Sequence, residues 1–68
     1  MISYKPFWNT LKTKGVSTYA LREKHKISPG ILTSMKENRY ISLSTVDQLC
    51  KILDCRIDEI AEYIPDTN

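Results

Sequence analysis

Apolar residues recur at helical spacing along most of the chain and predict five short helices. The clearest amphipathic pattern lies at residues 43–54, and similar patterns occupy residues 5–14 and 57–64. Two shorter patterns lie between them, at about 18–25 and 29–37, with only a few residues separating the two. Strand-like alternation is absent from the pattern. We therefore predict an all-α fold, a compact bundle of five helices.

Serine and proline residues place the starts of several of these helices. Ser17 and Ser28 each stand directly before a short helix, where a hydroxyl oxygen can cap free backbone N–H groups. Pro29 follows the second cap, at a position where its missing N–H costs nothing. Two alternatives remain for the helix after residue 40: a cap at Ser42, or a capping box made by Ser44 and Asp47.

The length of the chain predicts one small domain, residues 1–68. A domain of this size buries only about 60% of its unfolded surface, so its core must be compact or be completed by a second subunit. Apolar runs fall far short of the roughly 20 residues that a membrane helix needs. The start of the chain lacks the charged lead and apolar stretch of a secretory signal. We therefore expect a cytoplasmic protein without membrane association.

Residue types that carry chemistry are sparse. The chain has a single histidine, His25, and it lacks a phosphate-binding glycine loop and paired carboxylates in an apolar setting. We therefore expect no catalytic residues, no enzyme activity and no cofactor. Cys50 and Cys55 have no second ligand pair at a suitable spacing, so we expect two reduced structural cysteines and no metal site.

Charge is distributed unevenly along the chain. The net charge is +2, but residues 1–40 carry a net +6 and residues 41–68 a net −4. Such a polarised molecule turns its basic part toward a polyanion. Solubilising lysines on short helices would explain the number of charges, but they do not explain the segregation.

Residues 15–60 resemble the phage-repressor and Cro type of helix-turn-helix domain, also called the Xre family. Gly15-Val16-Ser17 precedes the first helix of the motif, Leu21 lies within it, and Ile27-Ser28 stands at the turn. Further matching residues are Leu32 and Met35 on the inner face of the second motif helix, 42–46, and 49–60. The segments 53–60 and 4–8 are similar to those of very small stand-alone bacterial regulators. The resemblance implies a five-helix bundle in which helices 2 and 3, about residues 17–37, form the helix-turn-helix.

Three residues depart from the family pattern. Arg22 stands where the family usually has a small residue, because the two motif helices approach closely there. Lys26 stands at the turn where the family usually has glycine. It must therefore adopt a left-handed conformation, at a cost on the order of 1 kcal/mol, or open the turn. Thr18 begins the first motif helix in place of the usual glutamine.

The resemblance implies binding to double-stranded DNA, with the helix at 29–37 entering the major groove. Base reading is then assigned to Pro29, Gly30, Thr33 and Ser34, with Ser28 near the DNA backbone. These short side chains cannot form the bidentate contacts of glutamine or arginine, so direct readout should be weak. DNA shape, or the flanking residues Lys36, Asn38, Arg39 and Tyr40, would have to add specificity.

Phosphate contacts are expected on both sides of the motif turn. The start of the helix at Ser17 and Thr18 presents free N–H groups to an anion. Lys26, Lys36 and Arg39 are near enough to add positive charge. For each lysine alone, a role as a solvated surface charge is an equally good interpretation.

The chain is expected to act as a DNA-binding transcriptional regulator and as a homodimer, because a monomer this small contacts too few base pairs. We expect the dimer interface at Ile60, Tyr63 and Ile64, with residues 1–4 as a second candidate. The alternative function is a protein-interaction module that keeps the helix-turn-helix fold without reading bases. The poor hydrogen-bonding capacity of Pro29 and Gly30 motivates that alternative.

Overall fold

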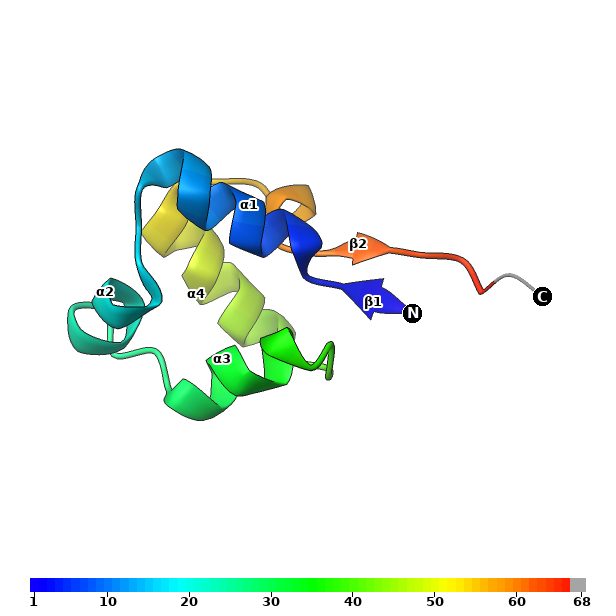
Figure 1. Cartoon of the computed structure of the whole chain (residues 1–68), viewed down its shortest axis with the longest axis horizontal. Helices are drawn as coiled ribbons and strands as arrows, with labels where there is room; N and C mark the ends of the chain where they lie inside the picture. The colour runs from blue at the N-terminus through cyan, green and yellow to red at the C-terminus, as the bar shows by residue number, and fades with distance from the viewer. Residues whose placement is uncertain (67–68) are drawn as a thin grey trace.

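The computed structural model describes residues 1–66, which form four α-helices, one 3₁₀ turn and a two-stranded sheet (Figure 1). The elements follow in the order β1 (Ile2–Ser3), α1 (Lys5–Lys14), α2 (Thr18–Glu23), α3 (Pro29–Lys36), α4 (Leu43–Leu53), η1 (Ile57–Glu59) and β2 (Glu62–Tyr63). The mostly helical fold and the first four helices are confirmed. The fifth helix and the absence of strands are not.

Serine caps fix the starts of three helices. Ser17 and Ser28 cap α2 and α3 as predicted, and Ser42 is the cap of α4. Their hydroxyl oxygens accept hydrogen bonds from the backbone N–H groups of Ala20, Gly30 and Thr45, at 3.0, 3.1 and 3.2 Å. The alternative of a box at Ser44 is therefore excluded. These local bonds define where α2, α3 and α4 begin.

Each of the four α-helices and the segment after η1 contributes one fully buried large side chain to the core. The most deeply buried side chains are Phe7 in α1, Leu21 in α2, Met35 in α3, Leu49 in α4 and Ile60 after η1. Burying a side chain of this size contributes about 1.5–3 kcal/mol relative to leaving it in water. The motif helices α2 and α3 are thus anchored from behind by α1, α4 and the segment around η1.

The predicted helix at residues 57–64 is wrong. The chain forms a 3₁₀ turn over Ile57–Glu59 and then the strand Glu62–Tyr63. Of the four apolar residues whose spacing suggested a helix, Ile60 is fully buried and Ala61 half-buried, whereas Ile57 and Ile64 are exposed. The spacing did not mark a single buried face.

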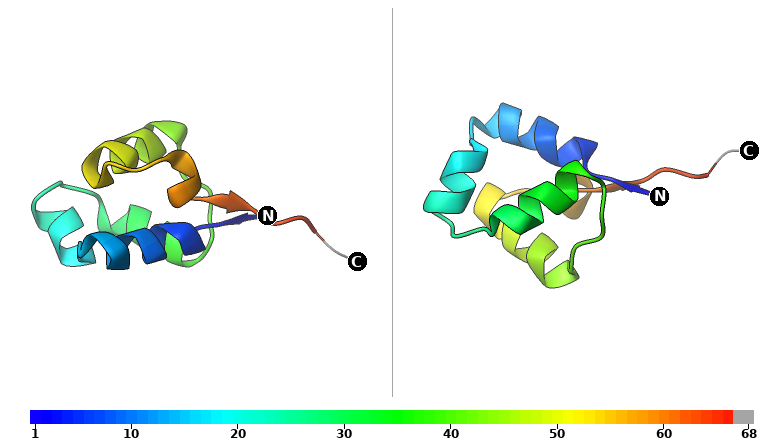
Figure 2. Two further views of the ribbon diagram at one scale, coloured as in Figure 1. Left: turned by 90° about the horizontal axis from the view of Figure 1, so that it is seen from above. Right: turned by 60° about the horizontal axis from the view of Figure 1, so that its bottom comes forward.

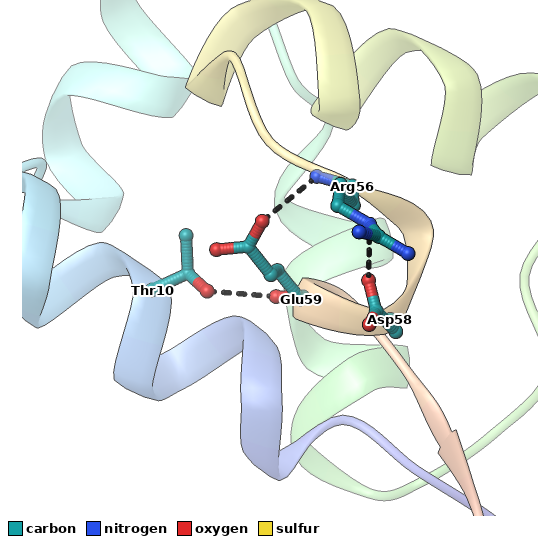
Figure 3. Close-up of polar contacts among 4 residues, drawn as sticks. All are labelled: Thr10, Arg56, Asp58 and Glu59. Carbon is teal, nitrogen blue, oxygen red and sulfur yellow. Dashed lines mark hydrogen bonds and ion pairs between the residues drawn. The ribbon is translucent and has the colours of Figure 1, made fainter.

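A hydrogen bond from outside the segment holds the 3₁₀ turn against α1 (Figure 3). The hydroxyl of Thr10 in α1 donates to the carbonyl oxygen of Glu59 over 2.8 Å. In an α-helix that carbonyl would also accept the N–H of Tyr63, four residues later, but Tyr63 lies in the strand that pairs with β1. The Glu59 carboxylate accepts the backbone N–H of Arg56 at 3.0 Å and closes the short turn. The chain then extends and pairs with β1.

The two strands bring the beginning and the end of the described chain together (Figure 1). They are antiparallel, with Ile2 opposite Tyr63 and Ser3 opposite Glu62. Met1 and Ile64 continue the ladder by exchanging two backbone hydrogen bonds of 2.8 Å. Among the helices of residues 1–66, none has the length and apolar character that crossing a membrane requires.

Candidate nucleic-acid interface

In Figure 1, α2 lies at the end of the molecule far from the terminal strands, and α3 runs along the lower side between α2 and the strands. The two motif helices meet at an angle and are joined by the segment 24–28 (Figure 2). Of the twelve residues predicted to contact DNA, eleven are exposed and Ser34 is half-buried. The predicted reading helix is therefore accessible along its outer side, and Ser34 offers less of its surface than Thr33.

The turn between α2 and α3 keeps its close geometry although it lacks glycine. Lys26 has φ 60°, the left-handed conformation that was one of the two predicted alternatives. The N–H of Ile27 then donates to the carbonyl of Leu21 at 3.0 Å, and the Ile27 side chain is buried. The Lys26 side chain is left exposed beside the motif. The turn thus carries the positively charged side chain of Lys26, although the backbone of that residue is strained.

The first turn of α3 presents little side-chain chemistry to a DNA base. Pro29 has no N–H, and the N–H of Gly30 is already bonded to the Ser28 hydroxyl. A methyl group added at Gly30 would lie 3.5 Å from that hydroxyl oxygen, an ordinary contact. Folding therefore does not require glycine at position 30. Its effect is a bare helix surface that a partner can approach closely.

A hollow of about 360 Å³ lies on the surface between side chains of α1, α2 and α3, and we call it the basic hollow. Two cationic side chains border it, Arg22 from α2 and Lys36 from α3. The remaining lining residues are Trp8, Thr18, Pro29, Leu32 and Thr33. The half-buried Trp8 ring packs edge-on against Phe7, with ring centroids 4.8 Å apart. The arrangement offers positive charge and hydroxyl groups along the length of α3.

Sequence reasoning did not bring Arg22 and Trp8 together with the candidate DNA-binding residues, as the basic hollow does. Their position depends on how three helices pack, which periodicity alone does not give. A signal was nevertheless present at Arg22, where a long charged side chain replaces the usual small residue. Arg22 is exposed in the structure, so its bulk lies in the basic hollow and not between the helix backbones.

The loop after α3 is held by a residue distant in sequence. Asn38 is left-handed, with φ 56°, and the N–H of Arg39 donates to the carbonyl of Ser34 at 2.8 Å. The buried Tyr4 donates its hydroxyl to the Arg39 carbonyl at 2.6 Å. Burial raises the pKa of the Tyr4 hydroxyl, which therefore stays protonated and able to donate. The loop is tied to the N-terminal end of α1.

The predicted flanking residues do not all face the same way. The Arg39 guanidinium pairs with the Glu37 carboxylate at 2.9 Å, so its charge is partly compensated. Tyr40 is 82% exposed and borders a different depression, lined chiefly by apolar residues. Lys36 belongs to the basic hollow. The structure thus groups Lys36 with the motif and separates Tyr40 from it.

A second depression lies beside the strands, and we call it the hairpin groove. Its volume is about 370 Å³, and it is lined by Ile2, Tyr4, Tyr40, Ile41, Leu43, Val46, Ile57, Asp58, Ala61, Glu62 and Tyr63. Tyr63, one of the predicted dimer residues, is 68% exposed, and Ile64 is 39% exposed. Ile60, the third, is fully buried in the core, so its side chain has no surface to offer a partner.

The remaining chemistry-bearing residues include two cysteines. Cys50 and Cys55 are free and half-buried. Within the described part of the chain, His, Cys, Asp and Glu side chains do not gather in threes that could hold a metal ion.

Comparison with known proteins relates this geometry to a family. The profile of a family described as the Cro/C1-type HTH (helix-turn-helix) DNA-binding domain matches residues 7–66. The chain is also similar to a solved structure entitled "Crystal structure of transcriptional regulator VanUg, Form II", with a TM-score of 0.85 and 26% sequence identity. That match covers 96% of this chain and 87% of the other. No curated protein matches the sequence.

Proposed function

Because the chain belongs to the Cro/C1-type helix-turn-helix DNA-binding family, we propose that it is a transcriptional regulator that places α3 in the major groove of an operator. The similar solved structure is of a protein named as a transcriptional regulator. The observation that carries the proposal is that Pro29, Gly30 and Thr33 of α3 are exposed. Arg22 and Lys36 border the hollow that Pro29 and Thr33 also line.

Base reading in this proposal rests on α3 residues with small side chains. Thr33 is exposed and can exchange hydrogen bonds with a base edge, and its methyl group can contact a thymine methyl. Pro29 and Gly30 let the helix approach the base edges without making bidentate contacts. Ser34, half-buried, contributes less than Thr33. Discrimination among sequences therefore depends substantially on DNA shape and on the residues that flank α3.

In this proposal, cationic side chains around the motif bind the phosphate backbone of the DNA. Arg22 and Lys36 face the basic hollow next to Thr18, where a phosphate would meet two positive charges and a hydroxyl. Lys26 extends this surface at the turn. Arg39 contributes when its guanidinium exchanges the ion pair with Glu37 for a contact with a phosphate. Phosphate contacts of this kind fix the register of a protein on DNA.

The proposal includes a homodimer on a paired operator site. One α3 of eight residues reads only a few base pairs, and two copies together read two half-sites about 34 Å apart. The exposed Tyr63 and Ile64 support a contact near the strands. Ile60 supports the core of each copy instead.

A salt titration of DNA affinity tests the phosphate role. The measurement compares a selected duplex with random duplexes, for the unaltered protein, for Arg22→Gln and for Arg56→Gln. Arg56 is 83% exposed and pairs with Asp58 at 3.3 Å, away from the basic hollow, so it is a matched control (Figure 3). Losing one phosphate contact at Arg22 should reduce the salt slope by about one unit, with no change for Arg56→Gln. Equal slopes for all three proteins would remove Arg22 from the interface.

The alternative function is an interaction module that keeps the fold without reading bases. The small, weakly hydrogen-bonding surface at Pro29 and Gly30 and the apolar hairpin groove are what favour it. The same titration decides between the two. Equal affinity for selected and random duplexes at low salt would favour the interaction module over the regulator.

A further inference from the structure

Two cysteines lie at the end of α4, outside the surfaces that the proposed function uses. Cys50 is in the last turn of α4, and Cys55 follows the capping residue Asp54. Both thiols are free and half-buried, and both side chains pack against the core. Neither residue lines the basic hollow or the hairpin groove. The regulator proposed above therefore leaves this pair of thiols without a role.

The backbone places the two cysteines at positions whose side chains meet. Asp54 is left-handed, with φ 49°, and its N–H donates to the carbonyl of Cys50. The N–H of Cys55 donates to the same carbonyl at 3.1 Å. A bond from the sixth residue back to the first, closed over a left-handed residue, is typical of the Schellman turn, in which the side chains at the two ends commonly make an apolar contact. In this turn both of those side chains are thiols.

Contacts from neighbouring elements hold this turn in place. The Lys14 ammonium of α1 donates to the carbonyl of Asp54 at 3.3 Å. On the other side of the turn, the backbone N–H of Arg56 donates to the Glu59 carboxylate at 3.0 Å (Figure 3). The fold therefore keeps the two thiols in a fixed relative position, which gives each a high local concentration toward the other.

The pKa of Cys55 gives a separate indication that the two thiols are neighbours. Burial raises this pKa to about 11, and repulsion from Cys50 is the next largest contribution. Glu59 adds to the shift in pKa, and Lys14 opposes it. At neutral pH Cys55 therefore stays protonated, and a first nucleophilic attack comes from Cys50.

We propose that Cys50 and Cys55 are a dithiol site that a low-molecular-weight disulfide oxidises to an intramolecular disulfide. The Cys50 thiolate attacks one sulfur of the reagent, forms a mixed disulfide and releases the first low-molecular-weight thiolate. Cys55 then loses its proton to water, its sulfur attacks the Cys50 sulfur, and the second thiolate leaves. The two cysteines give up two protons and two electrons, and the reagent is reduced to two thiols. Because the sulfur atoms are held together, the second step proceeds although little Cys55 thiolate is present at neutral pH.

A disulfide fits this pair better than a metal ion does. Among the residues that the structure describes, no third His, Cys, Asp or Glu side chain joins the pair to complete a metal site. A disulfide needs only two cysteines whose Cα atoms lie roughly 4.4–6.8 Å apart, and the hydrogen bond of 3.1 Å between their backbones brings Cys50 and Cys55 together. Because this site is separate from the basic hollow, the inference does not depend on DNA binding.

Equilibrium with glutathione tests the site in the full chain. The protein is incubated with defined ratios of reduced and oxidised glutathione, quenched with acid and weighed by mass spectrometry. The expected product is lighter than the reduced protein by two hydrogen atoms and carries no glutathione. Trypsin cleaves after Lys51, between the cysteines, so the peptides 40–51 and 52–56 should stay joined until a reductant is added.

A variant with one thiol moved by a single position is the matched control. Cys55→Ala with Arg56→Cys keeps two cysteines but takes the second thiol away from the sixth position of the turn. The Arg56 side chain is 83% exposed, so the change should leave the fold intact, which circular dichroism checks. The equilibrium constant for forming the intramolecular disulfide should be at least about tenfold lower in this variant than in the unaltered protein.

The unaltered protein in urea provides a reference that needs no substitution. Because the folded turn holds the thiols together, unfolding should lower the same equilibrium constant by at least about tenfold. Equal constants for folded and unfolded protein, or a folded protein that retains glutathione as a mixed disulfide, would overturn the proposal. Equal constants for the unaltered protein and the shifted variant would overturn it as well. These measurements involve no duplex, so they leave the proposed function to its own test.

Discussion

The hydroxyl of Tyr4 donates a hydrogen bond to the carbonyl of Arg39, and the two oxygens are 2.6 Å apart. This bond ties the N-terminal end of α1 to the loop that follows α3. Tyr4 is almost fully buried, whereas Arg39 is exposed. A core side chain thus positions a loop on the proposed DNA-binding surface, so stability and binding are coupled here.

Replacing Tyr4 by phenylalanine should destabilise the protein and loosen this loop. Loss of one buried hydrogen bond should lower the free energy of unfolding by about 1 kcal/mol, which corresponds to a fall of about 4–8 °C in Tm for a domain of this size. Thermal unfolding by circular dichroism measures the change. Tyr19→Phe is the control, because Tyr19 is 65% exposed and its loss of a hydroxyl should have little effect. Equal Tm values for both variants would contradict a structural role for the bond.

Lys26→Gly should stabilise the protein while weakening DNA binding. Glycine relieves the left-handed strain at φ 60°, but it also gains entropy in the unfolded chain, so the net gain should be about 0.5–1 kcal/mol. Lys24 is two residues earlier and has φ −84°, so Lys24→Gly removes the same charge without relieving strain. That control should be destabilised. Urea denaturation compares the two, and the same sign for both would refute the strain argument.

Gly30→Ala should separate folding from DNA binding. The added methyl group has room, and alanine is the better helix former by about 0.5–1 kcal/mol, so unfolding should require more denaturant. If α3 approaches base edges closely, the same methyl group should lower affinity for the selected duplex. Gly15→Ala is a useful contrast, because φ 67° at that position makes alanine strained and destabilising. Unchanged DNA affinity in a stabilised Gly30→Ala protein would argue against close approach at this position.

Glu37→Gln should increase DNA affinity. The carboxylate of Glu37 pairs with Arg39 at 2.9 Å on an exposed surface, where such a pair contributes only about 0.2–1 kcal/mol. Its removal frees the guanidinium for a phosphate at little cost to stability, and affinity should rise by about two- to fivefold. Asp47→Asn also removes one negative charge and one ion pair, on α4. Fluorescence anisotropy on a labelled duplex should show a smaller rise for Asp47→Asn than for Glu37→Gln.

The Cys55 thiol should be unreactive at neutral pH. Burial, with added repulsion from Cys50 and Glu59, raises the pKa of Cys55 from 9.0 to about 11. Because the folded pKa exceeds the unfolded one, the contribution to stability is complete below pH 9 and is lost as the pH rises toward 11. Alkylation of Cys55 by iodoacetamide in the unaltered protein, followed at that residue by mass spectrometry, should show a titration centred near 11 in the folded state. A midpoint near 9 without denaturant would contradict this pKa.

Local signals in the sequence predicted the helical part of the fold. Ser17 and Ser28 act as caps because a hydroxyl bonds to an N–H two or three residues away, and such bonds need nothing from the rest of the chain. The C-terminal segment differs because Thr10 and β1, both distant in sequence, decide its conformation. Periodicity alone could not reveal either contact.

The candidate site divides in the same way. The exposure of the α3 residues was accessible from sequence because it depends on a helix register. For Lys26 the sequence left two alternatives, and the structure shows the left-handed one. The association of Arg22 with Trp8 and Lys36 in the basic hollow depends on three helices meeting. The position of Tyr40 beside the strands could not be predicted, because the hydrophobic pattern did not predict the pairing of β1 with β2.

The pairing of residues 2–3 with residues 62–63 also bears on the order of events during synthesis. The helices depend on neighbours in sequence and can form early. The pairing of β1 with β2 joins residues about sixty positions apart and forms late. During translation β1 emerges long before β2. The sheet therefore closes only after all four helices have left the ribosome, and the packing of the helices brings the two strands within reach of each other.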